Sequence, residues 1–315
     1  MKAIAGLLVV LAGTVLAGIV VAGTVVLGQA PPALDVLAAQ VILDRAGFSP
    51  GEIDGMEGAN LRRALSAFQR VHTLPVSGRL DPATSAILVP LGGNEPMLVP
   101  YTLTAEDVAG PFAPSIPRDL MAQARLPRLD YRTPLEAMAE RVHASPGLLE
   151  RLNPGASFTQ AGEQVQVPNV GAIPPALGVY ATRIVVTKAT GALTVEDDQG
   201  RILFHAPVTN GSRHDPLPVG SWKVTSIHDM PPFHYNPALF WDASPKHSKA
   251  RIPPGPNNPV GVMWIDISKP HYGIHGTPEP SMVGHAQSHG CVRLTNWDVR
   301  RLSNWARPGM AVVFQ

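Results

Sequence analysis

The chain has 315 residues, of which 45% are hydrophobic, enough to build two or three domains with cores of their own. Its 25 lysine and arginine residues balance 24 aspartate and glutamate residues, so the net charge excludes the class of strongly basic, nucleic-acid-binding chains. The 33 prolines lie mostly between periodic segments, which predicts linkers and rigid loops.

Residues 1–30 are predicted to direct export. No charged residue occurs from Ala3 to Gln29, and Lys2 is the only positive residue before that stretch. Its length favours a membrane anchor formed by residues 3–28, because about 20 apolar residues span a bilayer. The small residues around Gln29 also fit the cleavage site of a signal peptide. Both alternatives stay open, and either one places the rest of the chain outside the cytoplasm.

The segment 36–90 is predicted to form a small helical domain. Its first helix is expected to end at Gly47, and Asn60 is expected to cap the second. Apolar residues recur at helical spacing along the second helix, at Leu61, Leu65, Phe68 and Val71. Asp81 and Pro82 are expected to supply the cap and first position of a third helix. The apolar face of that helix is expected at Ala83, Ala86 and Ile87.

Residues 91–128 are rich in proline and small residues, show no sustained period, and are predicted to form a linker. The segment 131–170 is expected to hold two helices, the second over 148–152, and then a short strand over 165–168. The apolar residues of the first of these helices are Leu135, Met138, Ala139 and Val142.

Residues 179–315 are predicted to form a mostly β domain. Strands are expected where β-branched runs alternate with glycine-containing turns, over 183–187, 193–195, 202–208, 222–225, 262–265 and 311–314. A helix over 297–306 is expected to pack one side against them.

Cys291 is the only cysteine, so no disulfide can form within the chain. A thiol of ordinary pKa, about 8.5, is only slightly ionised near pH 7, and an imidazole beside it can take its proton and later give it to a leaving amine. His275 and His289 precede the cysteine closely in sequence. Gly276 and Gly290 beside them allow close approach of a substrate, and backbone amides after Gly290 can stabilise an oxyanion.

Zinc binding is the alternative for the same stretch. Five residues include spacings typical of zinc ligands: His271, His275, His285, His289 and Cys291. Arg293 lies two residues beyond the thiol, and its positive charge fits stabilisation of a thiolate better than a neighbouring metal ion. We therefore expect no metal.

The two stretches 272–277 (Tyr-Gly-Ile-His-Gly-Thr) and 288–293 (Ser-His-Gly-Cys-Val-Arg) resemble the signatures of the L,D-transpeptidase catalytic domain, also called YkuD-like. Supporting matches lie at 215–222 and 255–261. The resemblance covers 179–314 and implies a β-sandwich-like mixed sheet. With the helical modules before it, the chain is expected to be a multidomain protein with a mostly β catalytic domain.

The resemblance implies that Cys291 is the nucleophile and His275 its base. Residues that orient the base or bind the oxyanion are expected to be Gly290, Gly276 and Thr277. Residues that bind substrate or support the site are expected to be His289, Arg293, Tyr272 and Ser288.

The implied reaction is acyl transfer on peptidoglycan. The thiolate attacks the third residue of a tetrapeptide stem, D-alanine leaves, and an amine of another stem or of a protein accepts the acyl group. Transfer to water would make the chain an L,D-carboxypeptidase or hydrolase. A non-catalytic wall-binding protein and a zinc-dependent hydrolase are further alternatives. No cofactor is required for thiol acyl transfer, and no nucleotide-binding or haem-attachment motif occurs.

Two upstream segments resemble wall-binding modules. Residues 36–90 are similar to the peptidoglycan-binding domain type 1, with its turn signatures at 51–55 and 78–84. Residues 131–170 resemble a LysM module without a clear first strand. These resemblances imply stem peptides and glycan strands as partners, in the cell envelope or periplasm.

The proline-rich stretch 231–254 carries four aromatic residues: Phe233, Tyr235, Phe240 and Trp241. An insertion of this kind near a site predicts a lid or a substrate wall. The alternative is a loop that these side chains tie to the sheet.

Overall fold

The computed structural model describes residues 34–171 and 179–315, so the predicted export segment 1–30 lies outside the described residues. Across the part that is described, no helix combines the length and apolar character that a membrane crossing requires. The first half of the chain contains, in order, α1 (Val36–Arg45), α2 (Ala59–Val71), α3 (Pro82–Gly92), β1 (Leu98–Thr102), α4 (Ala105–Ala109), α5 (Leu120–Gln123), α6 (Pro134–Arg141), α7 (Pro146–Leu152) and β2 (Gln164–Pro168).

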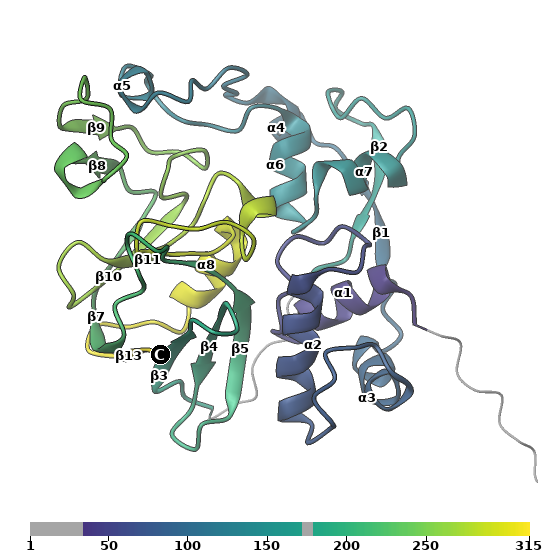
Figure 1. Ribbon diagram of the computed structural model, residues 1–315. Coiled ribbons are helices and arrows are strands. Elements are labelled where there is room, and N and C mark those ends of the chain that lie inside the picture. The colour runs from purple at the N-terminus through teal and green to yellow at the C-terminus, as the bar shows by residue number, and fades with distance from the viewer. Residues whose placement is uncertain (1–33, 172–178) are drawn as a thin grey trace, which may run out of the picture. The chain divides into compact units, whose positions relative to one another are not determined.

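The second half is mostly β structure (Figure 1). It contains β3 (Arg183–Thr187), β4 (Ala192–Glu196), β5 (Ile202–Pro207), β6 (Thr209–Asn210), β7 (Gly220–Asp229), β8 (Phe233–Tyr235), η1 (Pro237–Leu239), β9 (Ala250–Ile252), β10 (Met263–Ile267), β11 (Gly273–His275), η2 (Pro280–Met282), β12 (Val292–Arg293), α8 (Asn296–Ser303) and β13 (Ala311–Phe314).

A nine-stranded mixed sheet forms the frame of this second half, in the order β5-β4-β3-β13-β7-β10-β11-β12-β6. β13 runs parallel to β3 and β11 runs parallel to β12, whereas the other neighbouring pairs are antiparallel. The strands predicted over 183–187 and 311–314 occupy those residues. The prediction of a mostly β domain with a mixed sheet is therefore confirmed.

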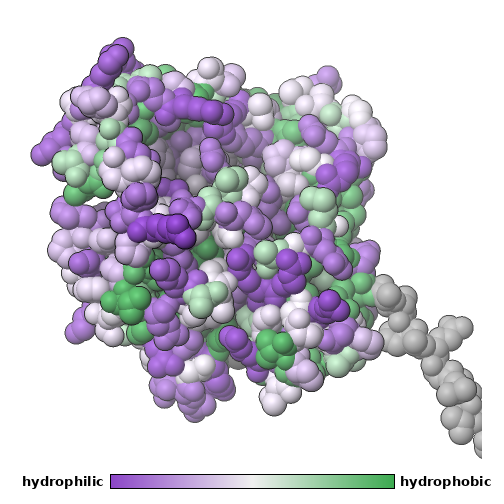
Figure 2. All heavy atoms as spheres, viewed as in Figure 1, coloured by the Kyte–Doolittle hydropathy of each residue, from purple (hydrophilic) through white to green (hydrophobic). Residues whose placement is uncertain are grey.

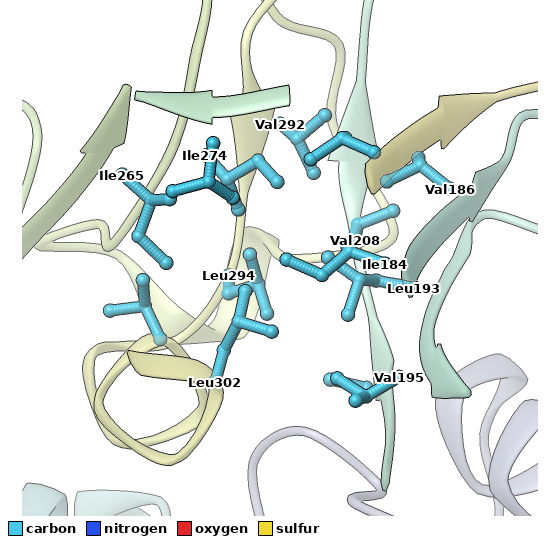
Figure 3. Packing of buried hydrophobic residues seen from close by; sticks show 14 of the residues in the cluster. Ile184, Val186, Leu193, Val195, Val208, Ile265, Ile274, Val292, Leu294 and Leu302 are labelled. Carbon is cyan, nitrogen blue, oxygen red and sulfur yellow. The ribbon is translucent and has the colours of Figure 1, made fainter. Parts of the chain in front are cut away.

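The core of the sheet domain lies between α8 and the strands (Figure 3). Ile274 of β11 and Val292 of β12 are fully buried, together with Leu302 of α8. Removing such apolar surface from water is the main favourable term in folding. The packing of these three residues therefore fixes how β11 and β12 sit on the helix.

The N-terminal helices form as predicted in number, but two details were wrong. Gly58, not Asn60, is the N-cap of α2, because the Asn60 side chain donates to the carbonyl of Val283 at 2.9 Å. The buried face of α3 contains Thr84 and Leu88, while Ala83 is exposed. A hydrogen bond from a glutamine of α2 satisfies the Thr84 hydroxyl, so a polar residue occupies a core position.

The segment 91–128, predicted as a linker, contains a strand and two short helices. Its strand β1 pairs antiparallel with β2 along five residues. Pro100 lies at the centre of β1, where proline is tolerated because a two-stranded sheet has only edge strands. Since proline is rare inside strands, no strand was predicted here. β1 and β2 share one core with α6 and α7. The strand β2 of the segment 131–170 therefore pairs with a strand from the residues before that segment.

A buried ion pair joins the N-terminal helices to the sheet domain. Asp44 of α1 is inaccessible to solvent, and Arg301 of α8 donates to both of its carboxylate oxygens at 2.8 Å. His143 approaches the same carboxylate at 3.0 Å. Burial alone would raise the pKa of Asp44, but the charges and hydrogen bonds of His143 and Arg301 lower it to about 2.

A second contact between these regions lies on the loop that precedes the cysteine. Arg63 of α2 donates to the carbonyl of Gly284 at 3.3 Å, next to the bond that Asn60 makes to Val283. Gly284 has a φ of +78°, and a Cβ there would lie 2.3 Å from the Asn60 side chain. Glycine at this position therefore allows both the loop conformation and the close approach of α2.

We predict that Arg301→Met destabilises the fold by about 3–5 kcal/mol, because it leaves a buried carboxylate without its cation. The matched control is Arg300→Met on the same helix, whose exposed pair with Asp229 stabilises by less than about 1 kcal/mol. Urea unfolding near pH 7 measures both. The lowered pKa of Asp44 means that its contribution is complete above about pH 4 and is lost as the pH falls toward 2. Equal effects of the two variants would contradict the prediction.

Candidate active site

Cys291, His275 and Arg293 lie together because β11 and β12 pair in parallel. Ile274 pairs with Val292 and His275 with Arg293. Side chains alternate between the two faces of a sheet, so the buried isoleucine and valine place the other three side chains on the opposite face. All three line one cleft of about 1120 Å³. The structure therefore brings together the three residues predicted to react or to carry charge.

The imidazole of His275 is held in one tautomer. It is 3% exposed, and its Nδ1 lies 2.7 Å from the carbonyl oxygen of Gly276, a residue that the family resemblance implies orients the base. A carbonyl oxygen only accepts, so Nδ1 carries the proton and Nε2 keeps its lone pair. Burial and the positive charge of Arg293 lower the pKa of His275 to about 3. At neutral pH this ring is an uncharged base.

The thiol of Cys291 is also uncharged at neutral pH. Burial raises its pKa above the ordinary value, although the Gly273 amide and the charge of Arg293 act in the opposite direction. Its Sγ lies 3.9 Å from the carbonyl oxygen of His271. The resting pair is therefore a thiol and a neutral imidazole rather than an ion pair.

The turn before the cysteine is fixed by Ser288 and Tyr272. The Ser288 hydroxyl donates to the carbonyl of Cys291 at 2.6 Å and accepts from the amide of Gly211 at 2.7 Å. Gly290 has a φ of +95°, and a Cβ there would lie 2.5 Å from the Tyr272 ring. Tyr272 lines the cleft, whereas Ser288 supports the turn from behind.

His289 and Arg293 differ in how their polar atoms are satisfied. The Nε2 of His289 lies 2.8 Å from a carboxylate oxygen of Asp242, which belongs to the stretch 231–254. The Nε of Arg293 is buried and has no hydrogen-bond partner among the described residues.

Thr277 does not line the cleft; its hydroxyl accepts from the amide of Glu279 and closes a turn.

The stretch 231–254 forms one wall of the cleft. β8 and β9 pair within it, and Phe240 packs edge-on against His289 at a ring-centroid distance of 5.0 Å. Its apolar side chains are held by Leu120 and Leu129 of the preceding region rather than by the sheet. In Figure 2 the surface is recessed beside this wall, and hydrophilic side chains predominate around it. The sequence did not predict that the segment around Leu120 and Leu129 supports this wall, because its few apolar residues are the only sign of packing there.

Two further residues near the site were missed. Trp264 of β10 stacks on His275, with ring centroids 5.1 Å apart. The Asn296 side chain accepts from the amide of Val262 and donates to the Glu140 carboxylate of α6. A Cβ at Gly276 would lie 2.3 Å from Asn296, so the glycine lets the two segments meet. No local pattern marks these contacts, because they depend on which strands become neighbours.

Of the five residues weighed as zinc ligands, His285 alone does not line the cleft. Over residues 34–171 and 179–315, no group of three His, Cys, Asp or Glu side chains is arranged to hold a metal ion. Cys291 and His275 face the cleft beside the guanidinium of Arg293, and His271 and His289 line the same cleft.

Known families match two parts of the chain. Residues 181–314 match the YkuD family, the L,D-transpeptidase catalytic domain, and residues 33–88 match a "Putative peptidoglycan binding domain". "Putative L,D-transpeptidase YkuD" of Bacillus licheniformis is 48% identical over 59 residues, which are 19% of this chain and 36% of that protein. "Probable L,D-transpeptidase ErfK/SrfK" of Escherichia coli is 27% identical over 194 residues, covering 55% of this chain and 56% of that protein.

The chain thus matches between about a third and just over half of the length of these curated relatives. Among solved structures, the L,D-transpeptidase of Xylanimonas cellulosilytica aligns with 89% of this chain and 92% of its own, at 16% identity and a TM-score of 0.37. The family matches and the named relatives agree with each other, and on that basis residues 181–314 are a catalytic domain of the L,D-transpeptidase family, preceded by a peptidoglycan-binding domain.

Proposed function

We propose that the chain is an L,D-transpeptidase that acts on peptidoglycan stem peptides, with Cys291 as nucleophile and His275 as base. The observation that carries this proposal is the free Nε2 of a neutral His275 in the same cleft as the only cysteine. The family match of residues 181–314 supports the same reaction. Peptidoglycan is also the partner that the upstream domain implies.

In the first half-reaction, Sγ of Cys291 attacks the carbonyl carbon of the third stem residue while Nε2 of His275 takes the thiol proton. The carbon–nitrogen bond to the terminal D-alanine breaks, and the imidazolium returns the proton to the departing amine. A thioester remains on Cys291. In the second half-reaction an acceptor amine attacks this thioester while His275 takes the amine proton, the carbon–sulfur bond breaks, and the imidazolium returns the proton to the departing thiolate of Cys291.

Three other groups are proposed to assist. The guanidinium of Arg293, whose buried Nε has no hydrogen-bond partner among the described residues, is suited to a substrate carboxylate, since such a donor gains most from a charged acceptor. The amides of Gly290 and Cys291 are proposed to stabilise the oxyanion, because the left-handed conformation of Gly290 sets the direction of this turn. His289, held by Asp242, is proposed to form the wall of the donor pocket.

The acceptor decides between transpeptidase and carboxypeptidase. Water in place of the amine would give an L,D-carboxypeptidase with the same residues. The wall formed by 231–254 lines the same cleft as Cys291, and we propose that it contacts a bound acceptor amine. We infer that the enzyme acts outside the cytoplasm, where its substrate lies.

The first test incubates residues 31–315 with a disaccharide-tetrapeptide and follows the products by mass spectrometry. We expect loss of D-alanine together with a crosslinked dimer, and neither product with Cys291→Ala. Loss of D-alanine without a dimer would assign the chain as a carboxypeptidase. Absence of both products, with an intact fold, would contradict the proposed reaction.

The second test concerns the uncharged resting pair. Because burial raises the pKa of Cys291, alkylation by iodoacetamide should be slower than that of free cysteine near neutral pH and should still be rising at a pH where free cysteine has reached its full rate. Stopped-flow or mass-spectrometric rates measure this, with Cys291→Ala as the control for other labelling. A rate plateau extending from about pH 5 to 8 would show a thiolate stabilised by imidazolium and overturn this description of the pair.

The third test concerns wall binding. We propose that the helical domain holds the chain on peptidoglycan and that the β1–α6–α7–β2 module contacts its glycan strands. Cys291→Ala should therefore sediment with insoluble peptidoglycan without forming product. Retention on glycan stripped of stem peptides is expected if the module binds sugar. A protein that stays in solution with both materials would refute the binding role.

A further inference from the structure

The mechanism leaves one requirement open. When His275 takes the proton of Cys291, an imidazolium forms at a site that is 3% exposed, beside the positive charge of Arg293. The carbonyl of Gly276 is the hydrogen-bond acceptor found for this ring. A buried cation needs further stabilisation, and because the Gly276 carbonyl binds the edge of the ring, the face of the ring is free to receive it.

The face of the imidazole is covered by Trp264. The two rings have centroids 5.1 Å apart and planes only 16° from parallel. Trp264 and His275 lie directly opposite each other in the antiparallel pair of β10 and β11, so both side chains project from the same face of the sheet. An indole face attracts a cation more strongly than the other aromatic side chains do.

Trp264 is itself held in one orientation. Its indole N–H donates to the carboxylate of Asp266 at 2.6 Å. The other oxygen of that carboxylate accepts from Ser226 at 2.8 Å and lies 3.1 Å from Nε2 of His228. The carboxylate adds electron density to the indole through this hydrogen bond, which favours a positive charge on the opposite ring.

The same indole lies over Gly273, two residues before His275. A Cβ at Gly273 would lie 2.4 Å from the Trp264 ring, so the ring occupies the space that any side chain there would need. The amide of Gly273 is the backbone group that lowers the pKa of the Cys291 thiol. Trp264 therefore touches the base and packs on the residue whose amide serves the nucleophile.

We propose that Trp264 is a positioning residue for the proposed acyl transfer: its ring holds the His275 imidazole and stabilises the imidazolium, and Asp266 fixes the ring. This inference rests on the proposed roles of Cys291 and His275. The charged and titratable groups around the imidazole are Arg293 and Cys291 on the β12 side, and Asp266 and His228 at the far edge of the indole.

The test uses an acyl donor that does not depend on peptidoglycan. Acylation of Cys291 by p-nitrophenyl acetate is followed by release of p-nitrophenolate in the whole protein and in Trp264→Leu, Trp264→Phe and Asp266→Asn. We expect Trp264→Leu to lower the acylation rate constant roughly tenfold with little change in the ester concentration at half-saturation. Trp264→Phe, which keeps an aromatic face, and Asp266→Asn, which removes only the charge, should fall between Trp264→Leu and the unchanged protein.

The matched control is Trp222→Leu. Trp222 is a half-buried tryptophan of the same sheet whose indole N–H binds the carbonyl of Pro218, and it does not line the cleft. We expect its acylation rate to be unchanged. Nitrogen-15 spectra of His275 should show a single Nδ1–H tautomer in the unchanged protein and in Trp222→Leu, and averaged tautomers in Trp264→Leu, because a ring that Trp264 no longer holds can turn away from the Gly276 carbonyl.

Equal rates in Trp264→Leu and the unchanged protein, or equal losses in Trp264→Leu and Trp222→Leu, would overturn the proposal. If Trp264→Leu does not fold, Trp264→Phe and Asp266→Asn still decide it, because both should be acylated more slowly than the unchanged protein and Trp222→Leu, and rates equal to these would overturn the proposal. Failure of the peptidoglycan reaction with normal esterase behaviour would count against the proposed function alone, since the ester reports on the thiol and its base.

Discussion

The parallel pairing of β11 with β12 decides where each group of the site lies. The hidden face of this pair carries Ile274 and Val292, which are fully buried against the helix α8. A shift of one residue in either strand would turn an apolar side chain into the cleft and a polar one into the core. Burial of the apolar side chains on the covered face therefore determines which polar side chains point into the cleft. The same burial keeps the two short strands in register without a long ladder of hydrogen bonds.

The regions upstream of the sheet domain make hydrogen bonds that hold α8 and the loop before Cys291, and so they support the pairing of β11 with β12. Arg301 of α8 donates hydrogen bonds to Asp44 of α1. Asn296, at the start of α8, donates a hydrogen bond to the carboxylate of Glu140 in α6. On the other side of the site, Asn60 contacts the loop that leads to the cysteine. The helix α2 and the loop that leads to Cys291 thus share hydrogen bonds, so the presence of one bears on the geometry of the other.

The sequence predicted what depends on local patterns. Runs of β-branched residues located most strands of the sheet, and Asp81 with Pro82 marked the start of α3. The contact between His275 and the Gly276 carbonyl followed from the family resemblance. β1 was not predicted because Pro100 at its centre is atypical of strands and because β2, the strand that β1 pairs with, lies more than sixty residues away.

Other features could not be read from the chain at all. The buried face of α3 includes Thr84, since a neighbouring helix supplies the hydrogen bond that its hydroxyl needs. Trp264 meets His275 only because β10 and β11 pair in one particular register. A residue's spacing in sequence says which face it occupies, but not which residue of another strand stands opposite. Such pairings become visible only once the order of strands in the sheet is known.

The uncharged state of Cys291 has a consequence for how long the protein stays active. Oxidants attack the thiolate much faster than the thiol, and the first product, a sulfenic acid, leads on to irreversible forms. Outside the cytoplasm no thiol pool is at hand to reverse that damage, and no second cysteine in the chain could capture it. In the proposed mechanism Cys291 loses its proton only when a substrate carbonyl is in place, so it is exposed to oxidants as a thiolate for a small part of each cycle. Burial and a weakly basic partner thus preserve the one sulfur on which the proposed chemistry depends.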